Sequence, residues 1–379
     1  MTPLSARVCR FYVWGSNADG ALATTSHVGD DVLSPRPSNI YPLAPLDGGM
    51  DFACQTGDAI YCWGSNGYGR LGRGSSFTDA YSAEPVAVTG LSGTPLSMGV
   101  GSTHACAVVQ AGGTTAHCWG ANASGQLGNG TVVDAASPVQ VADPSSGAYA
   151  TIYAGQTHSC AVTNAGVMWC WGSNAWGQLA QDDSIVSTAT PSTITPPADD
   201  PDATWLLAAT GARNTCGSAD TGVVYCWGAA DLGTNGNGNL VDNQYAPVAA
   251  YTSGPLIKLL LKTNSVVLVT STQAVYGWGD NASGQLNASP VTDPIVTSAR
   301  TMAPFASGVS VGADFTCIFV TMGPQNVCGC VGNNANGQLG DGSRISASTP
   351  VAVPSAPGQY WTGIYSGYSS SYGTQGPAS

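Results

Sequence analysis

Charged residues are scarce in this sequence. Only 8% of its 379 residues are charged, against about 25% in ordinary globular proteins. Lys and Arg number 10 and Asp and Glu number 22, which gives a formal net charge of −12. The basic residues are scattered, and Arg70 with Arg73 is among the closest pairs. Because phosphate binding needs clustered Lys and Arg, this pattern argues against nucleic acid as a main partner.

Long apolar runs are also missing. The longest candidate, residues 256–269, is interrupted by Lys258 and Lys262 and falls short of the ~20 apolar residues of a membrane span. We therefore expect no membrane insertion. The first residues, Met1 to Val13, contain no apolar segment of the ~7–15 residues that a signal peptide needs. No signal peptide is seen in the chain, so we expect that a leader was removed or does not exist.

Motifs for catalysis or metal binding do not occur. The sequence has no Gly-rich phosphate loop, no nucleophile elbow and no Cys-x-x-Cys or other zinc pattern. We therefore expect no catalytic residue, no cofactor and no metal. A carbohydrate-binding or hydrolytic enzyme remains an alternative, because a Ser-Asp-His triad can assemble from residues that are far apart in the sequence.

What the chain does contain is an internal repeat, marked by a Trp-Gly pair that we call the anchor. The spacing between successive anchors runs from 49 residues (Trp14 to Trp63) to 56 residues (Trp63 to Trp119), close to the ~40–50 residues of a four-stranded propeller blade. An alternating stretch before each anchor predicts a hairpin. After the anchor comes a turn rich in Asn and Gly, as at residues 120–127, 172–179 and 332–339. The anchors are Trp-Gly pairs except the last, where Val replaces Trp: Trp14, Trp63, Trp119, Trp171, Trp227, Trp278 and Val331.

The pattern Cys-Trp-Gly-x-Asn-x-x-Gly-Gln-Leu-Gly resembles the signature of regulator of chromosome condensation repeats. The resemblance covers residues 11–372 in seven copies. It implies an all-β fold, a single seven-bladed propeller over residues 1–379 with a central channel. Departures at residues 229–233, at Asn287 and at Val331 put local turns in doubt. A kelch-type propeller is the alternative, but most repeats lack its paired glycines.

The first repeat lacks the strand that should precede its anchor hairpin. Residues 364–372 align with residues 152–160 of the fourth repeat. We therefore predict that the C-terminal segment, residues 361–379, supplies a closing strand to the first blade and ends in a short tail. Such closure removes the unpaired edges that a line of blades would present.

Ten of the 12 cysteines fall at two repeat positions, one in what we take as the inner strand and one directly before the anchor. Two blades lack both together, with Val13 and Tyr372 in blade one and Val266 and Gly277 in blade six. Loss in pairs indicates cross-strand disulfides, with reduced thiols or metal sites as alternatives. The predicted pairs are Cys54–Cys62, Cys106–Cys118, Cys160–Cys170, Cys216–Cys226 and Cys317–Cys330.

Cys9 and Cys328 lie outside these positions, in the first and last repeats. Because those repeats are neighbours in a closed ring, we predict a closure disulfide, with free thiols or intermolecular bonds as alternatives. Disulfides imply an oxidising compartment. We therefore expect a secreted or cell-surface protein, in a disulfide-bearing branch of the family.

Two aromatic residues, Tyr68 and Trp176, stand at turn tips and are the candidate interface residues. The alternative is packing over a neighbouring loop. The histidines His104 and His158 share a repeat position that is variable elsewhere, so we interpret them as structural. N-glycosylation acceptors occur at Asn129 and Asn287, and at the turn residues Asn122 and Asn281.

The sequence thus favours a non-catalytic protein–protein interaction module that binds through loops and turn tips on one propeller face. Its partner is another protein or further copies of itself. One alternative is a structural subunit of an extracellular filament or lattice. The family resemblance implies another, an inhibitor of a secreted hydrolase such as a β-lactamase. Acidic charge and the lack of a basic tail argue against a chromatin-bound exchange factor.

Overall fold

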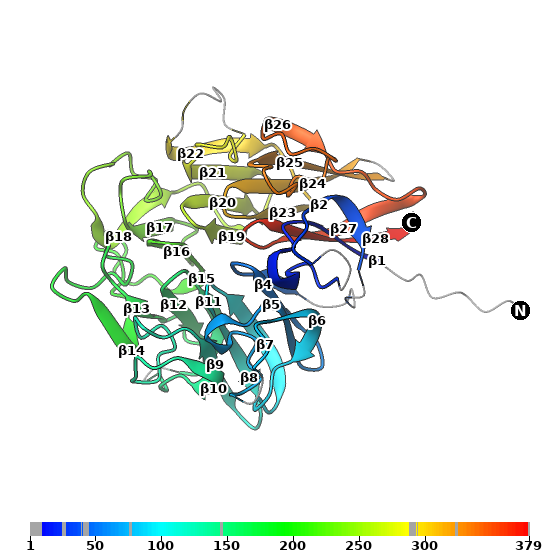
Figure 1. Ribbon diagram of the computed structural model, residues 1–379. Helices are drawn as coiled ribbons and strands as arrows, with labels where there is room; N and C mark the ends of the chain where they lie inside the picture. The colour runs from blue at the N-terminus through cyan, green and yellow to red at the C-terminus, as the bar shows by residue number, and fades with distance from the viewer. Residues whose placement is uncertain are drawn as a thin grey trace, which may run out of the picture.

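The computed structural model describes residues 10–24, 28–38, 40, 45–75, 78–144, 147–287, 293, 295–322 and 325–377. These residues form seven antiparallel sheets of four strands each, arranged in a ring (Figure 1). The predicted seven-bladed propeller is therefore confirmed. Blade one contains Trp14, blades two to six contain the next five Trp anchors in order, and blade seven contains Val331.

Within each blade the strands run outward from the ring axis. The first strands of blades one to seven are β27 (Gln359–Ser366), β3 (Leu46–Gly48), β7 (Thr94–Val100), β11 (Tyr149–Ala154), β15 (Trp205–Thr210), β19 (Leu256–Lys262) and β23 (Gly308–Val311). The second strands are β28 (Ser370–Pro377), β4 (Phe52–Thr56), β8 (His104–Gln110), β12 (His158–Thr163), β16 (Asn214–Ala219), β20 (Ser265–Thr270) and β24 (Phe315–Met322).

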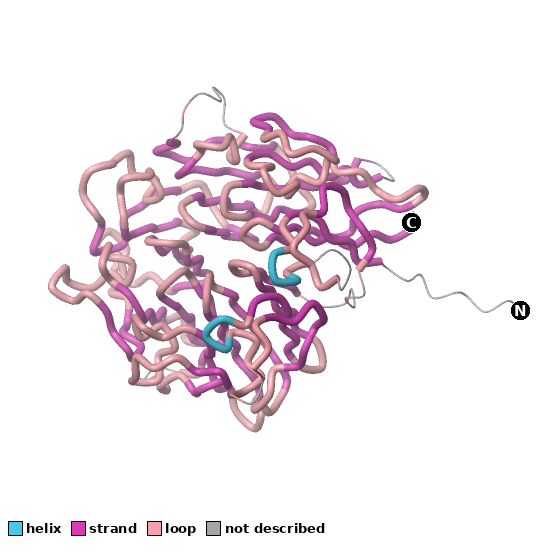
Figure 2. Tube along the Cα trace, in the orientation of Figure 1, coloured by secondary structure: helices cyan, strands magenta, loops and turns pink. Residues whose placement is uncertain are grey.

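The third strands carry the anchors at or next to their C-terminal ends. They are β1 (Arg10–Gly15), β5 (Ile60–Ser65), β9 (Thr114–Gly120), β13 (Met168–Ser173), β17 (Val224–Gly228), β21 (Val275–Asp280) and β25 (Gln325–Gly332). The outermost strands are β2 (Val32–Pro37), β6 (Tyr81–Ala87), β10 (Ala135–Gln140), β14 (Ser187–Thr193), β18 (Gln244–Tyr251), β22 (Ile295–Ala303) and β26 (Ala347–Ala352). Two short 3₁₀ turns, η1 (Ala18–Gly20) and η2 (Gly67–Gly69), are the cyan segments of Figure 2.

Blade one is assembled from both ends of the chain, in the strand order β2-β1-β28-β27. The N-terminal β1 pairs with the C-terminal β28, with Val13 opposite Tyr372. The predicted closure is present, but the C-terminal segment supplies two strands rather than one. The sequence alignment missed the extent of β27 because this strand begins before the segment that we aligned.

The anchor tryptophans join neighbouring blades. All six are fully buried, and each indole Nε1 donates to a backbone carbonyl of the preceding blade. Trp171, for example, donates to the Gln126 carbonyl at 2.9 Å. Each anchor ring therefore contributes apolar burial without the cost of an orphaned donor. Tyr149, Trp205 and Trp361 are 1–2% exposed and pack within the blades.

Disulfides tie the second strand of five blades to the third. The cysteines of all five predicted pairs face each other, with Cα atoms 4.0–4.1 Å apart. The first cysteine of each pair lies on the second strand of its blade, which forms the predicted hairpin with the anchor strand. In blade six Val267, not Val266, stands opposite Gly277. There, a Cβ added to Gly277 would lie 2.6 Å from the Met302 sulfur, so Met302 occupies the space of the missing bridge.

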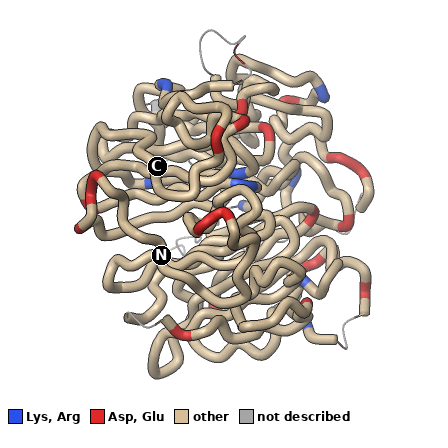
Figure 3. Tube along the Cα trace, turned by 90° about the vertical axis from the view of Figure 1, so that its left-hand side faces the viewer, with Lys and Arg blue, Asp and Glu red and all other residues tan. Residues whose placement is uncertain are grey.

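Cys328 is buried and is a free thiol in the described part of the chain. Its predicted partner Cys9 lies outside the described residues, so the closure disulfide stays a prediction. No helix among the described residues is long and apolar enough to span a membrane. Charged residues are sparse over the whole trace, as Figure 3 shows.

Candidate functional site

One end of the ring is built from turns that are bonded to one another. The turns between the first and second strands of neighbouring blades form a closed circle of hydrogen bonds around the channel, which we call the turn ring. Its donors and acceptors are Met50 N to Ser102 O, Ser102 N to Gly155 O, Gln156 N to Gly211 O, Ala212 N to Thr263 O, Thr263 Oγ1 to Ala313 O, Ala313 N to Tyr368 O and Tyr368 N to Gly49 O.

The turns between third and fourth strands follow one local design. The turn Asn folds back so that its Oδ1 accepts the backbone N–H of the Leu five residues later, as from Leu179 to Asn174 at 2.9 Å. The Gln of the motif accepts from the tip residue, as from Trp176 N to Gln178 Oε1 at 2.9 Å. Blade five lacks the turn Asn, and there Asn235 donates to the Ala229 carbonyl instead. The repeat thus fixes the tips by side-chain bonds.

Tyr68 is presented by a variant of this turn. Blade two has Arg70 where blades three, four, six and seven have Gln, and Tyr68 adopts a positive φ of 61°. Arg70 donates to the Met50 carbonyl at 2.8 Å, to the Ser102 carbonyl at 3.3 Å and to the Ser65 hydroxyl at 2.8 Å. The turn is therefore anchored to the turn ring, while the Tyr68 side chain is 58% exposed.

Trp176 is less free than Tyr68. The guanidinium of Arg213, from the next blade, lies over its ring at 4.9 Å and pairs with Asp231 at 2.9 Å. Trp176 is 41% exposed. Its contact with Arg213 agrees in part with the alternative that this ring packs over a neighbouring loop. The two candidate residues lie in blades two and four, with blade three between them.

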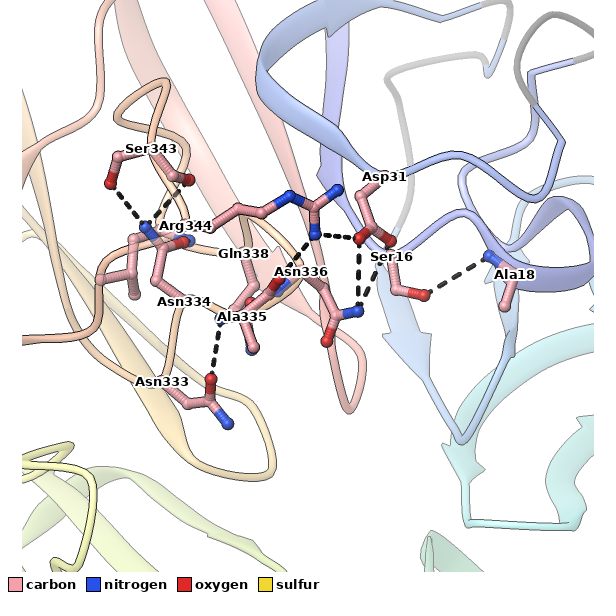
Figure 4. A network of polar contacts seen from close by, with 11 residues as sticks. Ser16, Ala18, Asp31, Asn333, Asn334, Ala335, Asn336, Gln338, Ser343 and Arg344 are labelled. Carbon is pink, nitrogen blue, oxygen red and sulfur yellow. Dashed lines mark hydrogen bonds and ion pairs between the residues drawn. The ribbon is translucent and has the colours of Figure 1, made fainter.

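A polar network joins blades seven and one across the closure. Arg344 pairs with Asp31, and Asn336 at the blade-seven tip donates to the same carboxylate at 3.4–3.5 Å (Figure 4). Sequence reasoning missed this network because Asp31 lies in a loop that has no fixed repeat position.

The histidines of the repeat are buried between blades. His104 Nε2 lies 2.8 Å from the Ser159 hydroxyl, and His158 Nε2 lies 2.9 Å from the Thr215 hydroxyl. Burial lowers the pKa of His104 to about 4 and that of His158 to about 3. These rings are therefore neutral links between blades, and no cluster of three or more His, Cys, Asp or Glu in the described residues could hold a metal.

The glycosylation acceptors differ in access. Asn122 and Asn281 are 0% and 2% exposed, and the Nδ2 of each donates to the loop that follows the turn. A glycan on either amide would displace that loop. Asn129 and Asn287 are partly exposed and remain the candidate sites of N-glycosylation.

The channel holds charges that the sequence analysis did not single out. A cavity of about 380 Å³ is bounded by the first strands, and its charged lining residues are Asp47, Lys258 and Lys262. Both lysines of the whole sequence lie on β19. Their spacing of four residues was the available signal, because alternate residues of a strand share one face.

Comparison with known proteins identifies the repeat. The regulator of chromosome condensation (RCC1) repeat matches residues 58–108, 115–162 and 330–372, and a second RCC1 repeat model matches residues 149–178. The chain contains RCC1 repeats. The family inferred from the Trp-Gly and Gly-Gln-Leu pattern is therefore confirmed.

RCC1-repeat relatives are found among proteins of different kinds. The ultraviolet-B receptor UVR8 of Arabidopsis thaliana is 27% identical over 365 residues, covering 92% of this chain and 79% of that protein. The E3 ubiquitin-protein ligase HERC2 of Homo sapiens is 26% identical over 302 residues, which span 74% of this chain but 6% of that protein.

Solved structures share the fold. Human WBSCR16 superimposes with a TM-score of 0.80 at 16% identity, covering 98% of this chain and all of that one. Yeast RCC1 (Prp20), in a structure with Kap60, gives a TM-score of 0.81 at 14% identity over 99% of this chain and 90% of that one. At such identities the likeness concerns the propeller and not its partners.

Proposed function

We propose that this RCC1-repeat protein is a non-catalytic protein–protein interaction module that binds a partner through the turn-ring face. The observation that carries the proposal is Tyr68, a large exposed aromatic side chain on a turn that Arg70 anchors at three points. An aromatic residue on a rigid support loses little conformational entropy on binding, and aromatic residues dominate interface hot spots. Trp176, steadied by Arg213, adds a second contact point.

The proposal places the protein outside the cytosol. Five disulfides at repeat positions favour an oxidising compartment. A secreted module or a subunit at a cell surface fits this setting. Sparse charge with little basic character fits a protein partner better than a nucleic acid.

The test is affinity capture from the extracellular fraction of the native source with three forms of the protein. Tyr68→Ala removes the proposed anchor, and Phe305→Ala removes an exposed aromatic ring (53%) from the loop between β22 and β23, at the opposite end of the blades, as a control. We expect Tyr68→Ala to weaken binding of the captured partner by about tenfold or more, and Phe305→Ala to leave it unchanged. Equal capture by all three forms would refute the proposal.

The structural-subunit alternative is separated by the mass in solution. A monomer that still captures a partner supports the docking module. Ordered polymers of the purified protein support a filament or lattice instead, and light scattering after size-exclusion chromatography distinguishes the two.

A further inference from the structure

The two lysines of this chain lie in the central channel, where Lys258 is exposed to the channel interior and Lys262 is half-buried. Lys258 and Lys262 both belong to β19, and both line the central channel. The remaining basic residues are all arginines. A chain with net charge −12 thus carries its lysines on a single channel-lining strand.

Lys262 is neutralised by a pair that crosses the channel. Its Nζ lies 3.1 Å from Asp47 Oδ1 and 5.6 Å from the centre of the Tyr368 ring. Asp47 belongs to β3 of blade two and Lys262 to β19 of blade six, and these strands are not neighbours around the axis. The pair lies toward the turn-ring end of the channel and partly obstructs it there.

Lys258 lacks such compensation. Its Nζ donates to the Val309 carbonyl at 2.7 Å, but no carboxylate of the described residues forms an ion pair with it. It stands four residues before Lys262, about 13 Å further from the turn ring at the usual rise of a strand. Desolvation by the channel walls lowers the pKa of Lys258, and the negative charge of Asp47 opposes that shift.

The channel walls suit a small ligand with an apolar body. Leu96, Leu260 and Val311 face the cavity together with Tyr153 and Tyr365. Its volume of about 380 Å³ falls within the ~300–1,000 Å³ of small-molecule sites. Two lysines against one aspartate give the lining a formal charge of +1, which matches a monoanion rather than a phosphate dianion.

We propose that the channel is a binding site for a small organic monocarboxylate, whose carboxylate pairs with Lys258 and whose apolar body packs against the leucines and tyrosines. The ligand enters from the end opposite the turn ring, because the Lys262–Asp47 pair and Tyr368 stand at the other end. The carboxylate supplies the counter-charge that Lys258 lacks, because an exposed ammonium group in the channel can donate to it a charge-assisted hydrogen bond, which is stronger than a neutral one.

The two lysines allow a direct test on the intact protein. Lysine labelled with ¹⁵N at Nζ gives two side-chain signals, one for each residue, and Lys258→Arg assigns them. Benzoate is the probe, with benzamide as its neutral analogue and inorganic phosphate as the dianion. We expect benzoate to shift the Lys258 signal and to raise the pKa of that residue, while benzamide has no such effect.

Variants locate the site. Lys258→Met should weaken benzoate binding about tenfold or more, and Lys258→Arg should retain it. Lys262→Met should retain benzoate binding, because Lys262 already has a partner in Asp47. Equal binding of benzoate and benzamide, an unmoved Lys258 signal, stronger binding of phosphate, or unchanged benzoate binding by Lys258→Met would each overturn the proposal. The response of the ¹⁵N side-chain signals of the wild-type protein to benzoate and benzamide tests the proposal even if a variant fails to fold.

Discussion

At the scale of single residues, the buried imidazoles of His104 and His158 link three consecutive blades. Each ring is fully buried, and neither Nδ1 has a hydrogen-bond partner among the residues that the structure describes. Protonation would place a charge between blades with no acceptor for the new N–H. The rings therefore work as blade links only while they are neutral.

Acidification should consequently weaken the fold through these two residues. Their pKa values fall from 6.5 to about 4 and about 3 on folding. Between pH 6.5 and about 4 the unfolded chain binds protons that the folded chain does not, so the free energy of unfolding falls as the pH drops. Each histidine contributes at most about 1.4 kcal/mol per pH unit. We expect chemical denaturation to show lower stability at pH 5 than at pH 7.

A double substitution isolates this effect. His104→Asn with His158→Asn uses the residue that blade five has at the same position, Asn214, which is buried and bonded to the Ala229 carbonyl. The carboxylates titrate alike in both proteins, so the difference in slope belongs to the histidines. An unchanged dependence of stability on pH would contradict the assignment.

Repeat positions in the sequence predict which residues pack inside a blade, but they do not predict contacts across the ring axis. Tyr149 and the anchor Trp171 were predictable, because a recurring aromatic position meets the same packing in every blade. The pair of Asp47 with Lys262 was not, since it depends on which blades face each other across the axis. Tyr68 was predicted at its tip, but its anchoring through Arg70 required the turn geometry.

At the scale of elements, the disulfide between the second and third strands is the recurring device. Cys160 and Cys170 are 10 residues apart, so the closed loop is short. The chain-entropy model gives about 3 kcal/mol for a loop of ~15 residues and less for shorter loops. Blade six packs without the bridge, because Met302 fills the space beside Gly277.

Replacing both cysteines of one bridge should therefore lower stability by a limited amount. We expect Cys160→Ala with Cys170→Ala to lower the free energy of unfolding by about 2–3 kcal/mol in urea under non-reducing conditions. Val267→Ala is the control, because it shortens a buried side chain at the equivalent position of blade six, where Gly277 stands opposite and no bridge exists. Equal losses for both proteins would show that packing, and not the covalent bond, stabilises the hairpin.

At the scale of the whole molecule, closure depends on β27 and β28. Tyr372 on β28 donates to the Ala21 carbonyl at 2.7 Å, and Trp361 on β27 packs at 5.3 Å from the ring centre of Trp14. Deleting residues 361–379 would leave blade one with an exposed edge and with part of its core missing.

We expect this deletion to abolish cooperative melting or to lower the melting temperature strongly. Tyr372→Phe is the graded comparison, since it removes a buried hydroxyl that donates to the Ala21 carbonyl and accepts from the Ser370 hydroxyl, and it should cost about 1–3 kcal/mol. Circular dichroism during heating measures both. A truncated protein that melts at the wild-type temperature would refute closure by these strands.

The ring as a whole could be predicted from seven anchors in register, because repeated hairpins at this spacing are typical of propeller blades. The number of strands that each terminus supplies to blade one could not be predicted from the anchors alone. It depends on β27, which begins at Gln359, before the aligned residues 364–372.

The pairing of β1 with β28 also decides how the molecule responds to force. The strands run antiparallel, and Arg10 stands opposite Gln375, so the first residues of β1 and the last residues of β28 lie at the same end of the sheet. Opposed pulling on these two strand ends would load one inter-strand hydrogen bond after another, as in a zipper, and would open blade one at low tension.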